Sequence, residues 1–441
     1  MVWWTMKTVD ARGMGIRRTI IPGLFNSTLT WILMGFFIAY ILFFYRPIYE
    51  NSYHVMYFPT YVPPYMNVGS DLASLRDWSR QWIEGKANPY VEYNFFNPPL
   101  TVVLFAAFSY VPFSWAFRIA SASTMAVFFF SAFLFPLFYM GKRSVSPILL
   151  LIFAMGLMSY GFQFEIERGQ FNIVTTGCAL LAVLIYRAAP RYRWIAFLLI
   201  TIAIQLKIYP AIFILLFIEN WNTWRRHLRD LAVILVMNII SLFILGIPRF
   251  FDFIKIVGER IADPYIRVHN MSAKSFATLV FPDNPSIIMA LIFGLFIVCL
   301  IGALWYVSTR RQAMARYYLF LVCTVGALVI PSVSFDYKLP LLVAPVVILL
   351  DSITLSQNNI VVKIGRIASL VICSAVFAST LFSFTNKIFI PGIGDAPISI
   401  LIQNNLPSLM VLLVGFAFLT VTQNSSQDAP SIQKESAISP I

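Results

Sequence analysis

The sequence has little charge, little histidine and no closely spaced cysteine. Of its 441 residues only 12% are charged, three are histidine and four are cysteine. Each cysteine stands alone in an apolar segment, as small buried hydrophobic residues do; they are Cys178, Cys299, Cys323 and Cys373. A glycine-rich phosphate loop, a histidine pair at metal-binding spacing and a haem motif are also missing. We therefore expect no cofactor and no metal, which leaves ATP-driven and redox roles without support.

Apolar residues dominate instead. They make up 59% of the chain, which contains 41 phenylalanines. Runs such as 194–218 and 286–307 are continuously apolar and long enough to cross the ~30 Å hydrocarbon layer as helices. Barrel strands would instead alternate in character over about 10 residues. The sequence predicts an all-α, polytopic transmembrane bundle of about 11 to 12 helices.

The net charge of +13 does not point to nucleic acid. Lysine and arginine gather in small clusters at the ends of apolar runs, as membrane topology favours, and no exposed segment interleaves basic and aromatic residues. Four basic residues precede a first span at 28–45: Lys7, Arg12, Arg17 and Arg18. No small-residue cleavage site follows that span, so we expect a retained anchor.

The basic clusters also predict sidedness. They recur at 142–143, 187–193, 225–229, 310–316 and 363–366. If each cluster is cytoplasmic, the chain between two of them must cross the membrane and return. The outer tips are then 165–172, 207–210, 248–285 and 334–338, on the same side as the first outer loop, 46–97. The polar residues that are hardest to explain as lipid-facing fall on that side, which predicts a single outward-facing site.

Three segments complete the predicted organisation. Residues 1–422 form one transmembrane domain, and 423–441, rich in Ser, Gln and Asn, form a disordered cytoplasmic tail. The segment 194–221 is too short for two full spans, so Lys207 is expected where two short helices meet inside the bundle. The segment 98–140 looks like two crossings where an odd number is needed. Either it contains a re-entrant piece or the basic pair after it lies outside.

The first outer loop contains a predicted interfacial helix. Its apolar positions recur at helical spacing, at Leu72, Leu75, Trp78 and Trp82. Tryptophan suits the headgroup layer, so the helix is expected to lie along the membrane surface. Ser70 or Asp71 would cap its start, and Gly85 would end it. Five tyrosines before it also suit an interface: Tyr49, Tyr53, Tyr57, Tyr61 and Tyr65.

Asp71 is the strongest candidate for a catalytic residue in this loop. A loop that faces water needs no carboxylate next to the first transmembrane span, so the presence of one indicates a function. On position alone it either caps the helix or acts as a general base. Asp77 projects from a different face of the helix, so the two do not form a carboxylate pair of the glycosidase kind. A metal held by both is a weaker alternative. A single general base is the better interpretation.

Two cations are predicted near membrane depth, where ionisable residues are functional hypotheses by default. Lys207 and Arg168, facing an outer cavity, would suit a phosphate or diphosphate group. The simpler alternatives are that Lys207 snorkels to the interface and that Arg168 pairs with Glu165 or Glu167.

Two further outer segments carry weaker candidates. In the long loop, His269, Asn270 and Ser272 could contact a sugar or a phosphate, although a lone histidine in a loop is more often unremarkable. At the last outer tip, Lys338 could meet a phosphate, or Asp336 could simply pair with it.

An ordered series of short motifs resembles glycosyltransferase family 87. The motifs are Ser70-Asp71-Leu72, Gly85, Asn88-Pro89-Tyr90, 95–100, Gly169-Gln170-Phe171-Asn172, Lys207-Ile208-Tyr209-Pro210, 269–272 and 331–337. Only their order, across residues 69 to 350, makes the set specific. The family consists of polytopic enzymes of the GT-C superfamily and includes a mannosyltransferase that extends phosphatidylinositol mannosides.

The resemblance implies a mechanism and a set of site residues. Family members transfer a sugar from a polyprenyl phosphate to a lipid or glycan hydroxyl on the outer face, with inversion and usually without metal. Asp71 would be the general base, and Lys207, Arg168 and Lys338 would bind the donor phosphate. Seven further residues are expected to contact substrate: Gln170, Asn172, Tyr209, His269, Asn270, Tyr337 and Asp77.

One motif departs from the family pattern. Where members commonly carry Ser-Trp-x-His-His, this chain reads Ser334-Phe335-Asp336-Tyr337-Lys338, which lacks the histidines. Two other classes remain open: a transporter or flippase for a lipid-linked glycan, and a glycan polymerase or ligase. A transporter should show paired broken helices in matching halves, and only one break is evident, at Lys207. We expect a bacterial plasma membrane protein of the cell envelope, with its site facing the periplasm or the exterior.

Overall fold

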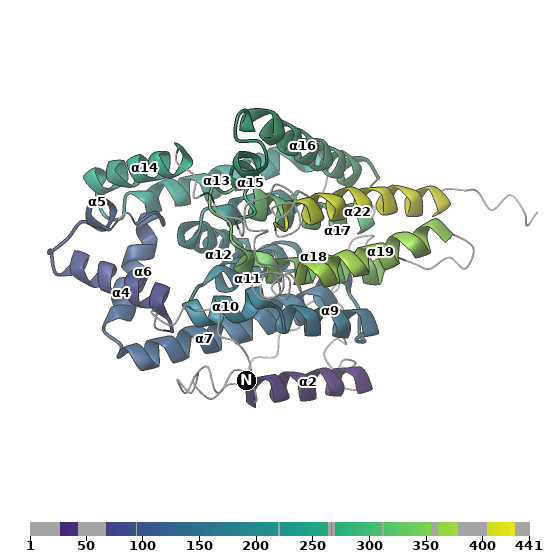
Figure 1. The fold of residues 1–441 in the computed structure, drawn as a ribbon, viewed down its shortest axis with the longest axis horizontal. Coiled ribbons are helices and arrows are strands. Elements are labelled where there is room, and N and C mark those ends of the chain that lie inside the picture. Colours follow the sequence, from purple (N-terminus) through teal and green to yellow (C-terminus); the bar gives the residue numbers. More distant parts are fainter. Residues whose placement is uncertain are drawn as a thin grey trace, which may run out of the picture.

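The computed structural model of the chain describes residues 27–42, 68–93, 95–218, 221–262, 266, 270–310, 313–353, 360–377 and 404–427. Every secondary-structure element longer than one residue in these ranges is a helix. The one β-type pairing is an isolated bridge between Asn270 and Phe335. The helices pack side by side into a bundle (Figure 1). The all-α, polytopic expectation is confirmed.

Within the described ranges, three single helices are long and apolar enough to cross a membrane. The first is a rod made of α7 (Phe113–Phe129), the π-helical turn η3 (Phe130–Leu134) and α8 (Phe135–Met140). The others are α16 (Pro285–Arg310) and α19 (Ile360–Phe377). Two bent pairs also qualify: α9 (Pro147–Leu157) with α10 (Tyr160–Arg168), bent by 47°, and α13 (Trp224–Leu242) with α14 (Ile247–Ala262), bent by 103°.

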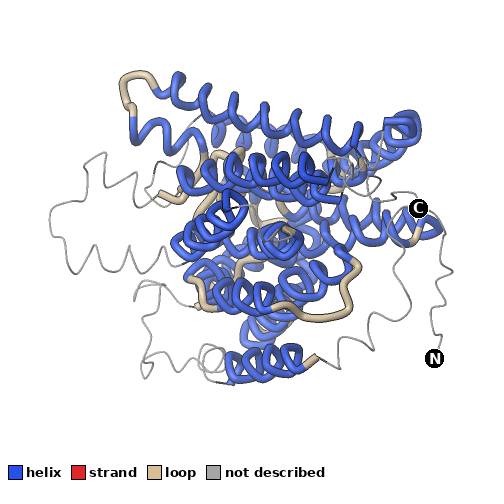
Figure 2. Tube along the Cα trace, turned by 90° about the vertical axis from the view of Figure 1, so that its right-hand side faces the viewer, coloured by secondary structure: helices blue, strands red, loops and turns tan. Residues whose placement is uncertain are grey.

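Shorter apolar helices fill the space between these spans. They are α2 (Thr28–Tyr40), α6 (Pro99–Ser109), α11 (Asn172–Ala188), α17 (Ala313–Val329) and α22 (Leu406–Gln427). Helix α17 forms the centre, because it is buried along almost its whole length and packs against α16, α18 (Val343–Ser352) and α22. Figure 2 shows the surrounding helices in side view. Outer helices such as α16 expose apolar side chains, as contact with lipid requires.

The segment 98–140 contains one crossing and one short helix. Helix α6 has 11 residues, which is about 16 Å of helix and half the depth of the hydrocarbon layer. It packs against the interfacial helix, and a turn before Phe113 leads into the α7–α8 rod. This arrangement favours the re-entrant alternative over two crossings.

The break at Lys207 is confirmed. Helix α12 (Arg193–Leu206) follows the short turn η4 (Pro190–Tyr192), and it ends at Lys207, whose backbone is extended with φ −150° and ψ 135°. The chain resumes as the 3₁₀ helix η5 (Tyr209–Phe217). Both pieces pack against α11, so the irregular backbone is enclosed by protein, as it must be at membrane depth.

The predicted interfacial helix is α4 (Ser70–Ile83), with Leu72 and Leu75 buried. The expected cap is wrong: Gly69, at φ +74°, precedes the helix, and neither Ser70 nor Asp71 caps it through its side chain. Gly85, at φ +66°, ends it as predicted. The Gly85 and Lys86 amides donate back to the carbonyls of Trp82 and Gln81, a Schellman arrangement.

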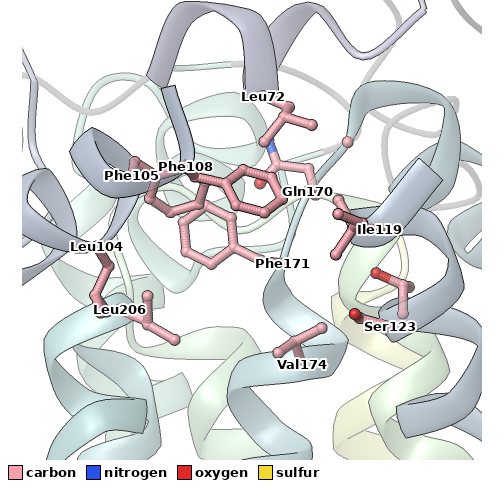
Figure 3. A pocket seen from close by; sticks show the side chains of 13 residues that line it. Leu72, Leu104, Phe105, Phe108, Ile119, Ser123, Gln170, Phe171, Val174 and Leu206 are labelled. Carbon is pink, nitrogen blue, oxygen red and sulfur yellow. The ribbon is translucent and has the colours of Figure 1, made fainter. Parts of the chain in front are cut away.

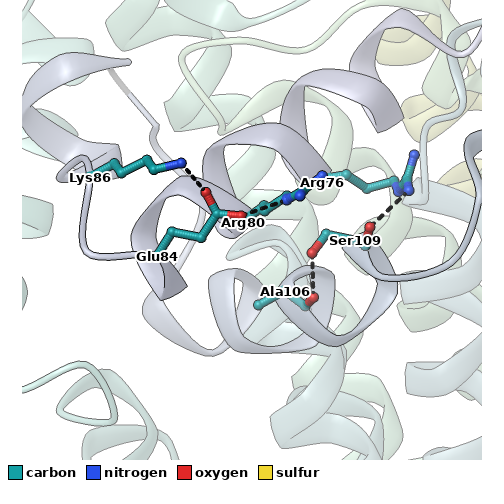
Figure 4. Close-up of polar contacts among 6 residues, drawn as sticks. All are labelled: Arg76, Arg80, Glu84, Lys86, Ala106 and Ser109. Carbon is teal, nitrogen blue, oxygen red and sulfur yellow. Dashed lines mark hydrogen bonds and ion pairs between the residues drawn. The ribbon is translucent and has the colours of Figure 1, made fainter.

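Charged residues on α4 serve mainly to anchor it (Figure 4). Arg76 is buried and donates to the carbonyls of Phe108 at 3.3 Å and Ser109 at 3.1 Å, and also to that of Val111, so it completes the end of α6. Arg80 and Lys86 both bind Glu84 on the exposed side.

The remaining short elements are α5 (Pro89–Glu92), η6 (Trp221–Thr223), α15 (Ala273–Val280) and η7 (Asp336–Leu342). Helix α22 runs to Gln427, five residues into the segment expected to be a disordered tail. The five interfacial tyrosines, the N-terminal basic residues, His269 and residues 428–441 lie outside the described residues.

Candidate active site

The turn between α10 and α11 meets the start of α4. The Gly69 amide donates to the carbonyl of Glu167 at 2.7 Å. Gly169 has φ +66°, and a Cβ added there would lie 2.8 Å from the Cβ of Leu72. Only glycine combines this backbone with so close an approach. The two glycines therefore bring the first turn of α4 against the turn that carries Arg168.

Asp71 is held by two donors from that turn. Arg168 Nη2 lies 2.5 Å from Asp71 Oδ1, and Arg168 Nε lies 3.1 Å from Oδ2, a bidentate ion pair. Gln170 Nε2 also donates to Oδ2. The side chain of Asp71 is 24% exposed and that of Arg168 is 21% exposed. Asp71 is therefore an oriented carboxylate that solvent can reach, and it is not a helix cap.

The alternative that Arg168 pairs with Glu165 or Glu167 is wrong. Glu167 accepts instead from Gln163 Nε2 at 2.7 Å. Glu165 is fully buried and accepts from Asn172 Nδ2 at 2.9 Å and from the Ile173 amide at 3.1 Å. It thus binds the amino end of α11, where a negative charge is favourable. Sequence reasoning missed this role, because Glu165 lies within α10 and the turn that returns it to the start of α11 is a feature of the fold.

Lys207 lies beside two aromatic rings. Its Nζ is 4.6 Å from the centroid of Phe171 and 5.9 Å from that of Phe96. Glu165 and Asp71 are the negative charges that act on it. Among the described residues its side chain forms no hydrogen bond and no ion pair, so its ammonium donors stay available to a ligand.

Lys338 is the second lysine of the cluster and lies near Lys207. Its side chain is buried, and Nζ donates to the carbonyl of Val333 at 3.1 Å and to Ser334 Oγ at 3.4 Å. It lies 4.9 Å from the ring centroid of Tyr209, and Lys207 is near enough to repel it. The alternative that Asp336 pairs with Lys338 is wrong, because Asp336 accepts from Asn405 Nδ2 at 3.2 Å.

Four polar residues predicted from the sequence gather around these charges. Gln170 contacts Asp71, and Tyr209 donates to the carbonyl of Asn172 at 3.1 Å. Tyr337 lies near enough to Asp71 and Glu165 to feel both charges. The Oδ1 atom of Asn172 is buried and has no hydrogen-bond partner among the described residues. An unused acceptor at the centre of a polar cluster is free to meet a ligand hydroxyl.

Two other predicted substrate contacts lie elsewhere. Asp77 is exposed farther along α4. Asn270 is fully buried and holds two loops together: its Oδ1 accepts from the amides of Ser272 at 3.2 Å and Ser334 at 2.8 Å, and its Nδ2 donates to the carbonyl of Ser332 at 3.0 Å. It therefore supports the segment that carries Lys338 and does not reach the cluster directly.

The structure adds a cation that the sequence did not single out. Arg260, near the end of α14, lies 5.7 Å from the ring centroid of Phe96, the ring that Lys207 also approaches. Phe96 is 43% exposed. Helix α14 is tied down by Asn88, whose Nδ2 donates to Asp252 Oδ2 at 2.7 Å. The sequence shows that 247–262 has a charged face. It does not show that this face contacts Phe96, which is more than 150 positions away.

An apolar cavity of about 230 Å³ lies behind Phe171 (Figure 3). It opens between α6, α7, α11 and α12, and its lining includes Leu104, Phe105, Ile119, Ala120 and Val174. Gly169 and Gln170 form its inner end, which joins it to the Asp71 cluster. Leu104 and Ile119 are 41% and 46% exposed, so the cavity reaches the outer surface of the bundle.

The described residues contain no group of three His, Cys, Asp or Glu side chains placed to hold a metal. The arrangement offers one reachable carboxylate, several cations and an adjoining apolar cavity. It can accept a proton, bind an anionic group and hold an apolar chain.

A comparison with protein families identifies the family of this chain. The family model described as Glycosyltransferase family 87 matches residues 95–331, which is more than half of the chain. That range includes Arg168, Gln170, Lys207 and Arg260, and it begins after Asp71. No curated protein matches the chain.

Proposed function

The chain belongs to glycosyltransferase family 87, a family of the GT-C type, and from this premise we propose that it moves a sugar from a polyprenyl phosphate to a lipid or glycan hydroxyl. It is an integral-membrane glycosyltransferase. The observation that carries the finer proposal is the reachable carboxylate of Asp71, set beside cations and an apolar cavity. We further propose that the sugar is mannose or a similar hexose and that the site faces the periplasm or exterior.

Asp71 is the proposed general base. The acceptor hydroxyl gives its proton to a carboxylate oxygen of Asp71 as its own oxygen attacks the anomeric carbon. The bond from that carbon to the phosphate oxygen breaks, and the electron pair leaves with the polyprenyl phosphate. Attack from the side opposite the leaving group inverts the anomeric centre. Arg168 and Gln170 fix the carboxylate so that one face of it points to the acceptor.

Arg168 also competes with the acceptor for Asp71, because its guanidinium binds both oxygens of the carboxylate. A bound donor phosphate would compete for the same guanidinium and so loosen the pair. Donor binding would thereby free a carboxylate oxygen of Asp71 for the acceptor hydroxyl.

The donor phosphate is proposed to lie between Lys207 and Arg260, which approach the same Phe96 ring from two elements. Lys207 supports this role best, since its donors have no protein partner among the described residues. As the glycosidic bond breaks, the negative charge that grows on the phosphate is stabilised mainly by Lys207, whereas Arg260 holds the phosphate before and during the reaction. Lys338, whose ammonium already donates to Val333 and Ser334, contributes mainly through its field.

The cavity behind Phe171 is proposed to hold the part of the donor's lipid chain nearest the phosphate. Phe171 both contacts Lys207 and lines the cavity, so the proposed phosphate and chain positions are adjacent. Because the chain enters from lipid that is as apolar as the lining, the cavity would position the chain and would add little hydrophobic free energy.

Transfer of labelled sugar from a panel of polyprenyl-phosphate sugars to a membrane lipid extract tests the proposal. Asp71→Asn should lose at least about 100-fold in rate, the low end for a missing general base. Asp77→Asn is the matched control, because Asp77 is exposed on the same helix. Both proteins are compared with wild type at equal thermal stability. Equal transfer by wild type and Asp71→Asn, or no transfer from any donor, would contradict it and favour a lipid-linked glycan transporter.

A further inference from the structure

A second basic cluster lies at the other end of α11 from the candidate active site. Asn172 starts this helix and Tyr186 lies in its last turn, about 21 Å away along the axis. Two arginines lie at Tyr186: Arg193 at the start of α12 and Arg226 in the first turn of α13. Arg187, next in sequence at the end of α11, points its guanidinium to Tyr139, 4.9 Å from that ring centroid.

Two of these guanidinium groups approach one ring. Arg193 lies 4.8 Å and Arg226 lies 5.9 Å from the ring centroid of Tyr186. One face of that ring is covered by Phe217, which stacks in parallel at 4.3 Å with an interplanar angle of 6°. Both arginines therefore approach the ring from directions other than the face that Phe217 covers. They share the ring although their positive charges repel each other.

These arginines carry buried donors that the described protein does not use. The atoms are Arg193 Nε, Arg226 Nε and Nη2, and Arg187 Nε and Nη1. Arg187 uses one other nitrogen, Nη2, which donates to the carbonyl of Leu216 at 2.7 Å. An unpaired buried donor is costly, and more so when it is charged.

The carboxylates of the described residues are too few to balance the cluster. Among the described residues, Asp230 is the carboxylate bound here, and it is shared by Tyr186 Oη at 2.8 Å, Arg229 at 3.3 Å and Arg226 at 3.8 Å. Arg193 and Arg187 have no carboxylate partner within the described residues. A bound anion would satisfy both the charge and the idle donors.

The cluster lies at the level of a membrane surface. Trp194 and Trp224, next to it in sequence, are 62% and 48% exposed, as tryptophan is at the border between lipid and water. Apolar helices α12 and α13 begin at this level. Basic pockets between membrane helices are suited to lipid headgroups. We propose that Arg193 and Arg226, supported by Arg187, bind the phosphate of an anionic membrane phospholipid.

Lipid binding by the full-length protein in detergent tests this proposal. Phosphatidylglycerol, phosphatidylcholine and inorganic phosphate are titrated separately, and bound lipid is followed by native mass spectrometry and by the shift in Tm. Wild type should bind phosphatidylglycerol, and the double variant Arg193→Gln/Arg226→Gln should bind it at least tenfold more weakly. Arg225→Gln is the matched control, because Arg225 is exposed beside Arg226 and lies over Trp224. It should bind as wild type does.

Three outcomes would overturn the proposal. Unchanged binding by the double variant would remove the arginines from the site. Equal binding of phosphatidylcholine would remove the need for an anionic headgroup. A Tm shift from inorganic phosphate as large as that from phosphatidylglycerol would show a soluble-anion site. If the double variant does not fold, the single variant Arg193→Gln should still weaken binding at least threefold. The test does not use transferase activity, so it stands apart from the proposed function.

Discussion

At the residue scale, the site depends on how each charge is partnered. Asp71 accepts hydrogen bonds from Arg168 and Gln170. Glu165 accepts from the Asn172 side chain and from the Ile173 amide at the start of α11. Among the described residues, the ammonium of Lys207 has only aromatic rings as partners. A charge whose partners are rings keeps its donors for a ligand, whereas a saturated charge mainly positions others. Lys207 can therefore bind a ligand directly, whereas Lys338 already donates to Val333 and Ser334. Arg260 also lies over an aromatic ring, so its role in ligand binding is worth testing.

Arg260→Gln should raise the KM for the donor about tenfold and change kcat less, because one charge-assisted contact to the phosphate is lost in both ground and transition states. The measurement is steady-state transfer with varied donor. Lys255→Gln is the control, since Lys255 is exposed on the same helix. An unchanged KM for Arg260→Gln, or an equal rise for Lys255→Gln, would remove Arg260 from the phosphate site.

Gly169→Ala should destabilise the protein by about 1–3 kcal/mol and also reduce transfer, because it adds backbone strain and pushes Leu72 and Asp71 away from Arg168. Gly85→Ala has the same φ of +66° but meets nothing within 4 Å. It should cost only the backbone strain and leave transfer unchanged. Thermal unfolding and activity are measured for both. Equal losses of activity would show that the contact with Leu72 does not position Asp71.

At the element scale, periodicity and breaks were predictable from the sequence and close approaches were not. The spacing of Leu72 and Leu75 predicted α4, and the Lys207-Ile208-Tyr209-Pro210 motif predicted the break between α12 and η5. The cap failed because the start of α4 is fixed by Gly69 docking on Glu167, a tertiary contact. Arg260 was missed for the same reason. Local patterns identify helices, but a contact between distant segments needs the fold.

One short helix shapes the lipid side of the site. Helix α6 does not cross the membrane depth, so a gap remains between it and the α7 rod, and the cavity lies there. A full-length crossing at this position would pack against α7 and leave less space. The re-entrant piece thus has a functional consequence under the proposed mechanism.

Ala120→Phe should fill part of this cavity and raise the KM for a long-chain donor several-fold, while a donor with a very short chain is affected less. Ala122→Phe is the control, because Ala122 is exposed on the same helix and does not line the cavity. Transfer is measured with donors of two chain lengths. An equal effect on both lengths would point to a disturbed fold, and no effect on either would exclude the cavity as a chain site.

At the scale of the whole molecule, α11 joins two polar ends of an apolar bundle. Its start binds Glu165 and lies in the candidate active site, and its last turn carries Tyr186 in the second basic cluster. Because the helix spans most of the hydrocarbon thickness, the two ends should face opposite aqueous phases. The positive-inside tendency predicts that the basic end is cytoplasmic and that the Asp71 end is outside.

Single cysteines test this sidedness. The four native cysteines, which are buried or half-buried, are replaced by alanine, and Lys86→Cys and Arg229→Cys are introduced separately. Lys86 is 68% exposed near the Asp71 end and Arg229 is 71% exposed in the basic cluster. In right-side-out membrane vesicles, a membrane-impermeant maleimide should label Lys86→Cys at once and Arg229→Cys only after permeabilisation. Labelling of both before permeabilisation would place the two ends on one side, which is incompatible with α11 as a crossing. A reversed pattern would put Asp71 in the cytoplasm, where the acceptor would have to meet it.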